Sequence, residues 1–405
     1  MITTLNATQT ANMLKNMPHS IWALGFVSMF MDISSEMIHS LLPVFMVSVL
    51  GASVTMVGVM EGSADALAQL TKIFSGSLSD YLGKRKLLTL IGYGMAACAK
   101  PLLPLAHSVP TALAGRFIDR IGKGVRDAPR DALIGDIVAP EIRGAAFGLR
   151  QSLDTLGAVL GPIIALLLME WLGSTIRGVL WIAIIPAFIA VAILAFGVKE
   201  PERQTAKTRP PLRLYDIQHI GKAYWQLVAI AFVLTLARFS EAFLILKAQS
   251  TGLPIALAPM ALVIMNIVYV LAAYPAGHFS DRMNRKNIIL VGTAFLLLAD
   301  IVLGIASTPM IVAIGVILWG LHMGFTQGLL AALVTDTTPA ELRGTAYGVY
   351  NFACGIALLI ASVIAGGLWD SFGPAATFFT GAVFTAIAMT SLFFIRNRPS
   401  PHHNA

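Results

Sequence analysis

Long apolar stretches alternate with short polar segments along almost the whole chain. Twelve of them reach the roughly 20 residues that a helix needs to cross a membrane. They predict helices at about 21–48, 54–78, 87–106, 109–134, 144–170, 178–197, 224–248, 256–278, 287–305, 309–334, 344–369 and 375–395. The pattern therefore predicts an all-α membrane protein with two six-helix bundles, 1–197 and 224–395, a cytoplasmic linker at 198–223 and a tail at 396–405.

Two segments of the first half recur in the second half. DIVAPEIRGAAFG begins at Asp136 and DTTPAELRGTAYG begins at Asp336. GSLSDYLGKRK, which begins at Gly76, likewise resembles GHFSDRMNRK, which begins at Gly277. Internal repeats in membrane transporters place the substrate between two halves that rock against each other. The duplication therefore favours a transporter.

Composition supports the membrane prediction. The 405 residues are 57% hydrophobic and only 12% charged, whereas soluble domains carry about 25% charged residues. The net charge of +7 does not indicate nucleic-acid binding, because most of the basic residues fall in loops on one side, where they indicate the cytoplasm. We expect a multi-pass protein of a bacterial inner membrane with both termini in the cytoplasm.

Neither the N-terminal segment nor the two cysteines change the interpretation of the chain as a membrane protein. The first twenty residues lack the basic start and cleavage site of a signal peptide. Cys98 and Cys354 lie in apolar runs of opposite halves, so we interpret both as small core residues without a disulfide.

The loop after the second helix carries a motif that identifies a family. The chain resembles the major facilitator superfamily, whose loop motif reads G-x-x-x-D-R/K-x-G-R/K-R/K. Gly76, Asp80, Gly83, Lys84 and Arg85 match it, and Tyr81 departs from it. A second copy holds Gly277, Asp281, Arg282, Arg285 and Lys286, with Asn284 in place of glycine.

Helices 4 and 5 match the family's patterns in part. The helix 4 pattern of the family reads G-R-F-x-Q-G-x-G-x-G, and the chain has GRFIDRIGKG from Gly115 to Gly124. Arg116, Gly122 and Gly124 match, whereas Asp119 and Arg120 replace Gln and Gly. In helix 5, Gly157, Gly161 and Pro162 match the pattern of proton-driven exporters, but its last two glycines are missing. The resemblance implies two six-helix bundles around a central cavity lined by helices 1, 4, 7 and 10, with the closest likeness to drug/proton antiporters.

Helix 4 carries an unusual number of charges for a membrane segment. They share one face: Arg116, Asp119, Arg120, Lys123, Arg126, Asp127, Arg130 and Asp131. Because ionisable groups are costly in lipid, we expect Arg116, Asp119, Arg120 and Lys123 to line the cavity. The lower four charges either line it as well or reach the cytoplasmic interface.

Helix 1 offers acids that could pair with these bases. Asp32, Glu36 and His39 share a face, and we expect Asp32 to lie opposite Arg116. Burial favours the neutral form of a carboxyl group and a nearby arginine favours its charged form. An arginine that moves during transport could therefore load and release a proton at Asp32 or Glu36, with Arg116 and Asp119 taking part. A static buried pair is the alternative.

The second half and helix 5 supply the remaining candidate substrate contacts. Arg238 and Glu241 lie one turn apart on helix 7, and Arg150 and Asp154 are spaced as a helical pair on helix 5. The full set of expected substrate contacts is Arg120, Lys123, His39, Asp154, Arg150, Arg238, Glu241, Trp319, His322 and Gln327. Helix 2 adds a stripe of Glu61, Asp65 and Lys72 that could contact either the other half or the substrate.

The loop motifs suggest gating. Asp80 and Asp281 would cap the N-termini of neighbouring helices, and the basic residues after them would lie against anionic headgroups. We therefore assign gating to Asp80, Gly83, Arg85, Asp281, Arg282, Arg285, Gly157, Gly161 and Pro162.

These features predict a monomeric, proton-coupled transporter of a small anionic or zwitterionic organic solute, with export by antiport favoured. Import of a metal-siderophore or a carboxylate by symport is the alternative, and a transporter-like membrane sensor is a remote one. No motif indicates an enzyme, a metal site, a cofactor or a nucleic-acid site. The expected partners are the lipid bilayer, protons and the solute.

Overall fold

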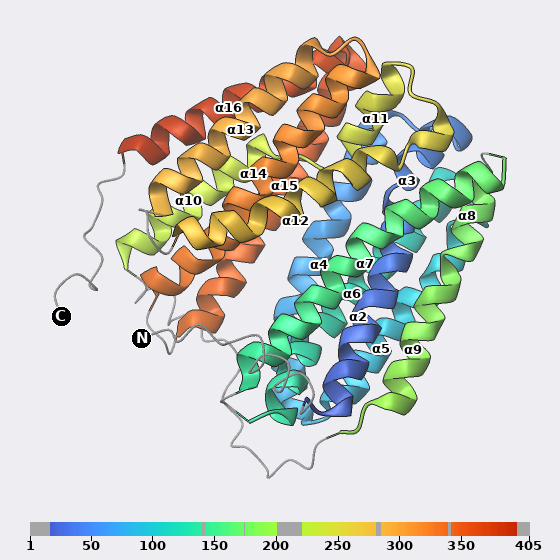
Figure 1. Ribbon diagram of the computed structural model, residues 1–405, viewed down its shortest axis with the longest axis vertical. Coiled ribbons are helices and arrows are strands. Elements are labelled where there is room, and N and C mark those ends of the chain that lie inside the picture. The colour runs from blue at the N-terminus through green and yellow to red at the C-terminus, as the bar shows by residue number, and fades with distance from the viewer. Residues whose placement is uncertain are drawn as a thin grey trace.

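The computed structural model describes residues 17–139, 142–173, 175–200, 221–280, 285–338 and 342–394. Every regular element within these residues is a helix (Figure 1). Nine of the described helical stretches are long and apolar enough to cross a membrane. The other three expected spans correspond to α4, α5 and α6, which are helical but carry charged residues. The all-helical prediction is confirmed, and the count of twelve spans stays a prediction.

Most helices begin and end within a few residues of the predicted limits. The predicted spans 21–48, 178–197 and 224–248 are each divided into shorter helices, and the helix predicted at 87–106 ends at Ala99. The first half contains α2 (His19–His39), α3 (Leu42–Val44), the π-helical turn η1 (Phe45–Val49), α4 (Val54–Leu82), α5 (Arg85–Ala99), η2 (Lys100–Leu102), α6 (Val109–Ile137), α7 (Arg143–Trp171), α8 (Ile176–Ile182) and α9 (Ile184–Gly197). The second half contains α10 (Lys222–Ala237), α11 (Ala242–Ser250), η5 (Ile255–Leu257), α12 (Met260–Ser280), α13 (Arg285–Ile305), α14 (Pro309–Thr337), α15 (Arg343–Phe372) and α16 (Pro374–Phe394).

Local chemistry explains several of these limits. The Ser53 hydroxyl accepts a hydrogen bond from the Met56 amide at 3.2 Å and begins α4. Gly83 ends the same helix with a φ of 64°, a left-handed conformation that favours glycine. Pro309 occupies the first turn of α14, where a missing amide hydrogen costs nothing.

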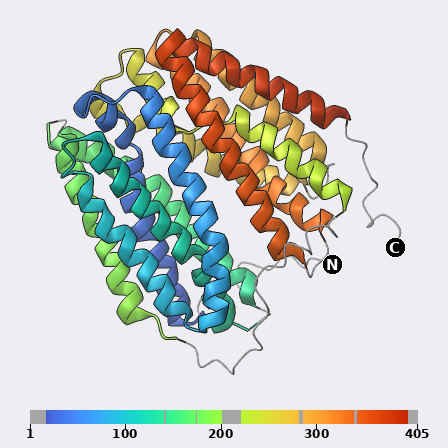
Figure 2. The same ribbon diagram turned by 180° about the vertical axis from the view of Figure 1, so that it is seen from behind.

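Helices α2–α9 gather on one side of the molecule and α10–α16 on the other (Figures 1 and 2). The two groups contact each other mainly through α4 with α15 and α7 with α12. Residues 201–220, which hold most of the expected linker, lie outside the described residues. The exact domain limits therefore stay a prediction.

The helix pair α4 and α15 packs through glycines. A Cβ atom on Gly58 would lie 2.1 Å from the Ser362 carbonyl oxygen, and one on Gly62 would lie 2.8 Å from the Leu359 Cα. Even an alanine would clash with backbone at both positions. The two halves thus touch almost backbone to backbone along this contact.

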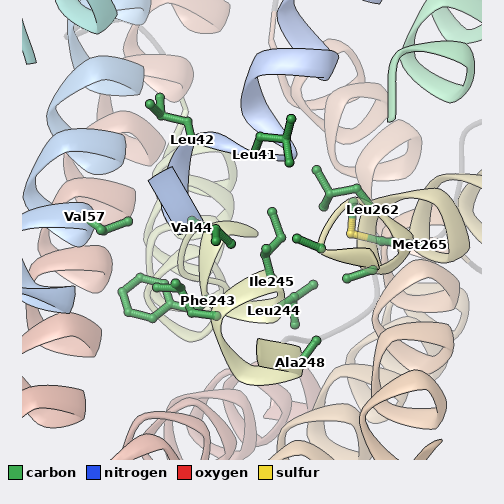
Figure 3. Packing of buried hydrophobic residues seen from close by; sticks show 14 of the residues in the cluster. Leu41, Leu42, Val44, Val57, Phe243, Leu244, Ile245, Ala248, Leu262 and Met265 are labelled. Carbon is green, nitrogen blue, oxygen red and sulfur yellow. The ribbon is translucent and has the colours of Figure 1, made fainter. Parts of the chain in front are cut away.

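An apolar plug packs between the two halves (Figure 3), where α3 and α11 meet at one end of the molecule (Figure 1). We define this plug by Leu41, Leu42, Val44, Val57, Phe243, Leu244, Ile245, Ala248, Leu262 and Met265, all buried. The first four belong to the first half and the others to the second. Close packing of apolar side chains excludes water from this end of the interface.

Candidate functional site

A cavity of about 310 Å³ lies between the halves next to the plug. Ten of its fourteen described lining residues have polar side chains: Asp65, Gln69, Thr235, Arg238, His322, Thr326, Gln327, Tyr350, Asn351 and Cys354. The others are Leu234, Leu330, Gly355 and Leu358. Along α4 the plug residue Val57 precedes the lining residues Asp65 and Gln69. The plug therefore bounds the cavity on the side where α4 begins.

A break in the seventh predicted span brings a cation to this cavity. Helix α10 ends at Ala237 and α11 begins at Ala242, so Arg238 ends one half-helix and lines the cavity. Discontinuous helices build the substrate sites of many transporters. The expected local pair with Glu241 is wrong, because among the described residues no carboxylate lies within 4 Å of Arg238.

His322 occupies the wall of the cavity with a defined orientation. Its Nδ1 lies 2.8 Å from the Gly292 carbonyl oxygen. Since a carbonyl only accepts, Nδ1 is the donor, and in the neutral ring Nε2 is left as an acceptor.

The buried charges of α6 form a separate cluster inside the first half, which we call the charge network. Arg116 donates to Glu61 on α4 at 2.5 Å, and the two side chains are 2% and 1% exposed. Asp119 lies 3.8 Å from Arg120 and 3.8 Å from Lys100. Each buried charge thus has an opposite charge nearby, which offsets part of its desolvation cost.

This network corrects two expectations. Arg116 pairs with Glu61, not with Asp32. The charged groups that interact with Asp32 are Asp154, Lys123 and Arg126. Arg116, Asp119 and Arg120 are buried within the first half, and Lys123 is half-buried. None of the four lines the cavity described above, so the expectation that they do is not met in this conformation.

The acids of α2 sit against α7 and α6. The Glu36 carboxylate lies 3.4 Å from His39 Nδ1. A Cβ atom on Gly157 would lie 3.1 Å from Asp32 Cβ, and one on Gly161 would lie 2.7 Å from Glu36 Cβ. The two glycines therefore let α7 approach the acidic face of α2 closely.

The C-terminal half of α6 is held in place by ion pairs and by an aromatic ring. The Arg126 guanidinium lies 4.4 Å from the centre of the Tyr93 ring, a cation–π distance. Arg130 lies 3.5 Å from Asp127 and 3.0 Å from Asp131. Arg126 and Arg130 are both buried, so this part of the helix packs inside the protein.

The cavity unites three of the expected substrate contacts: Arg238, His322 and Gln327. Trp319 does not line it: the indole is fully buried, with its ring centre 5.6 Å from that of Phe239. Arg120, Lys123, His39, Asp154, Arg150 and Glu241 are also outside the lining. Arg150 and Asp154 do form the expected pair, at 3.6 Å.

The gating residues are described only in part. Arg85 pairs with Asp136 at 3.1 Å and joins the start of α5 to the end of α6. Pro162 is buried inside α7. The side chains of Asp80 and Arg285 and the whole of Asp281 and Arg282 lie outside the described residues, so their gating role stays a prediction.

One cross-half contact was invisible in the sequence. The Asp370 carboxylate, near the end of α15, accepts hydrogen bonds from the Val54 amide at 3.1 Å, the Thr55 amide at 2.8 Å and the Thr55 hydroxyl at 2.6 Å. It therefore caps the N-terminus of α4 from the other half of the chain. We call this contact the latch.

Both cysteines are free. The expectation that both are core residues is wrong. Cys98 is exposed, and Cys354 is partly exposed and lines the cavity. Cys354 thus provides a native chemical probe of the site.

Comparisons with known proteins agree on one family. The family model described as "Major Facilitator Superfamily" matches residues 24–357 and 227–405. An MFS-type transporter of Methanocaldococcus jannaschii is 31% identical over 390 residues, covering 94% of this chain and 96% of the relative. The inner membrane transport protein YajR of Escherichia coli is 23% identical and covers 93% and 83%.

Further matches carry more specific names. The multidrug resistance protein MdtH of Cronobacter sakazakii is 24% identical over 355 residues, covering 85% of this chain and 83% of the relative. A crystal structure of the nucleoside transporter NupG superposes with a TM-score of 0.79 at 12% identity, covering 92% and 98%. At that identity the structural match establishes the fold alone.

Proposed function

The chain belongs to the major facilitator superfamily of membrane transporters, and on that premise we propose that it is a proton-coupled secondary transporter. Its solute is a small anionic or zwitterionic organic molecule, which it moves by alternating access. The observation that carries this proposal is the polar cavity between the halves, bounded at one end by the apolar plug. A substrate site that is sealed on one side is what alternating access requires.

The position of the basic loops supports an orientation. Lys84, Arg85 and Lys86 follow α4 at its end remote from the plug, and Lys199 follows α9. Under the positive-inside rule this end faces the cytoplasm. The conformation is then inward-facing, with the plug closing the periplasmic side of an inner-membrane protein.

Proton coupling is assigned to the acids next to the α6 charge network. The proposed carboxyl groups are Asp32, Glu36 and Asp119. Arg116, which lies 4.0 Å from Asp119, is the base whose displacement would release that carboxylate for protonation. The close contacts of Gly157 and Gly161 on α7 with α2 support this assignment. Without side chains at these two positions, α2 could slide along α7 and move Asp32 and Glu36 relative to α6.

Export by proton antiport is favoured by the glycine and proline pattern at Gly157, Gly161 and Pro162, and by the relative named as a multidrug resistance protein. Proton symport, with uptake of a metal-siderophore or a carboxylate, is the second candidate. The cation Arg238 supports it, because a guanidinium that lines the cavity and has no carboxylate within 4 Å among the described residues suits an anionic solute.

The test is transport by purified protein in proteoliposomes that contain a pH-sensitive dye. A solute that stabilises the protein thermally is added outside, and we expect it to dissipate an imposed pH gradient. Asp32→Asn should abolish this coupling and preserve solute exchange, whereas Glu170→Gln, which changes an exposed acid, should leave coupling intact. Solute flux without any proton movement in the unmodified protein would refute proton coupling, and absence of any flux would favour the sensor.

A further inference from the structure

We propose that the solute is a small zwitterion whose carboxylate binds Arg238 and whose cationic nitrogen binds Asp65, so that one molecule bridges the two halves. The inference rests on the transport function proposed above and narrows its substrate class. It also assigns Asp65 a binding role.

The first argument is the charge of the lining. Asp65 on α4 and Arg238 after α10 are the lining residues with full charges, and they come from opposite halves. Neither has an ion-pair partner within 4 Å among the described residues. Arg120 interacts electrostatically with Asp65 and also with Asp119, from which it lies 3.8 Å away, but it lies more than 4 Å from Asp65. The cavity therefore presents one acid and one base that do not neutralise each other.

The second argument compares solutes by charge. A simple anion would bind Arg238 but face the Asp65 carboxylate across the same small space, and a simple cation would face Arg238. Only a molecule with both charges gains at both ends, since charge-assisted hydrogen bonds are the strong ones and an unpaired charge is costly. A guanidinium also fits a planar carboxylate through two parallel hydrogen bonds.

The third argument is the size and polarity of the cavity. Its volume of about 310 Å³ is at the lower end of small-molecule pockets, which run from about 300 to 1,000 Å³. Its neutral lining offers amides, hydroxyls and the Nε2 acceptor of His322. These groups suit a short polar molecule and not a bulky apolar one.

Binding to both halves would also allow the solute to drive the transition between the two conformations of the transporter. A ligand shifts a conformational equilibrium only as far as its affinity differs between the two states. A zwitterion held by one charge on each half makes both contacts only when the halves are correctly apposed. A solute with one charge would engage a single half and give no such preference.

The experiment uses Cys354 as a reporter in a Cys98→Ser background, because Cys354 lines the same cavity. The rate of its alkylation by N-ethylmaleimide is measured on the purified full-length protein. The probes are ω-amino acids from glycine to 6-aminohexanoate, each with the corresponding fatty acid and alkylamine of equal length. We expect at least one amino acid to protect Cys354 and its two single-charge analogues to protect about tenfold less well.

Two variants locate the contacts. Asp65→Asn and Arg238→Gln should each weaken protection by the amino acid about tenfold, while Arg177→Gln, whose guanidinium donates to the Pro104 carbonyl, should not. Size-exclusion profiles and thermal stability check that each variant is folded, and the analogue series on the unmodified protein does not depend on any variant.

Three results would overturn the assignment: equal protection by a fatty acid and its amino acid, unchanged protection in a folded Asp65→Asn variant, or no protection by any amino acid in the series. The transport proposal fails separately. If proteoliposomes carry a solute with one charge, the transport function stands and the zwitterion is refuted. If amino acids protect Cys354 but are never carried, binding stands and transport is refuted.

Discussion

Removal of the latch should shift the balance between the two conformations of the transporter. Asp370→Ala deletes three hydrogen bonds to the first turn of α4, at 3.1, 2.8 and 2.6 Å. Loss of an N-cap side chain costs typically about 1 kcal/mol, with a range of about 0.5–2, and loss of a negative charge at a helix N-terminus costs a further ~0.3–1 kcal/mol. Because the contact joins the halves at the plug end, this cost falls on the state in which that end is closed.

A loss of about 1–2 kcal/mol corresponds to a factor of about 5–30 in the ratio of the two states. The assay is alkylation of a cysteine placed in the plug. Val57→Cys, in a background with Cys98→Ser and Cys354→Ser, introduces a side chain that is fully buried while the plug is closed. Its modification rate by a membrane-impermeant maleimide reports the population of the state with that end open, and Asp370→Ala should raise the rate about 5–30-fold.

A graded series separates the latch from general damage. Asp370→Asn keeps one acceptor oxygen, and Thr55→Val removes only the hydroxyl bond at 2.6 Å, so both should raise the rate less than Asp370→Ala. A rate that stays within about twofold of the parent in Asp370→Ala would refute the reasoning, because the latch would then contribute almost nothing.

Three further predictions concern the buried pair, the helix contact and the loop motif. Glu61→Ala removes the closest partner of the buried Arg116 charge and leaves Asp119 at 4.0 Å. It should cost ~3–5 kcal/mol of stability in thermal denaturation; adding Arg116→Ala should recover part of this loss, and strict additivity would count against the pair. Gly157→Ala would place a Cβ 2.5 Å from the Met29 carbonyl oxygen and should cost ~1–3 kcal/mol; a neutral effect would mean that the helices shift easily. Asp80→Asn should slow turnover with little change in solute affinity, and a large loss of affinity would exclude a purely gating role.

The sequence was sufficient to predict the helices, because apolar length and polar gaps directly specify spans in a membrane. It also identified the charged face of α6, where Ile118 on the opposite face is indeed exposed. Helical spacing specifies which residues share a face but not which helix that face meets. For that reason Arg116 was assigned to Asp32 and not to Glu61, although both acids were visible in the sequence.

The features that the sequence could not provide depend on distant packing. No proline or glycine marks the break between α10 and α11, so the exposure of Arg238 to a cavity had no local signal. Trp319 is an expected substrate contact because of its place on helix 10, yet its ring packs against Phe239 in an aromatic core. The capping role of Asp370 joins residues more than 300 positions apart, and no periodicity in one chain reveals such a pair.

The glycine contact between α4 and α15 lies near one end of α4, so this long helix can act as a lever that pivots about the contact. The 29 residues of α4 make it about 44 Å long at ~1.5 Å per residue, and its closest approaches to α15 lie in its first third. From Gly58 and Gly62 to its far end, α4 extends about 30–36 Å. If the halves pivot about this contact by about 15°, as subunits of allosteric proteins do, the far end of α4 would swing through ~8–9 Å. A small rotation about this glycine contact, near one face of the bilayer, could thus open the interface between the halves at the opposite face wide enough to admit a small molecule.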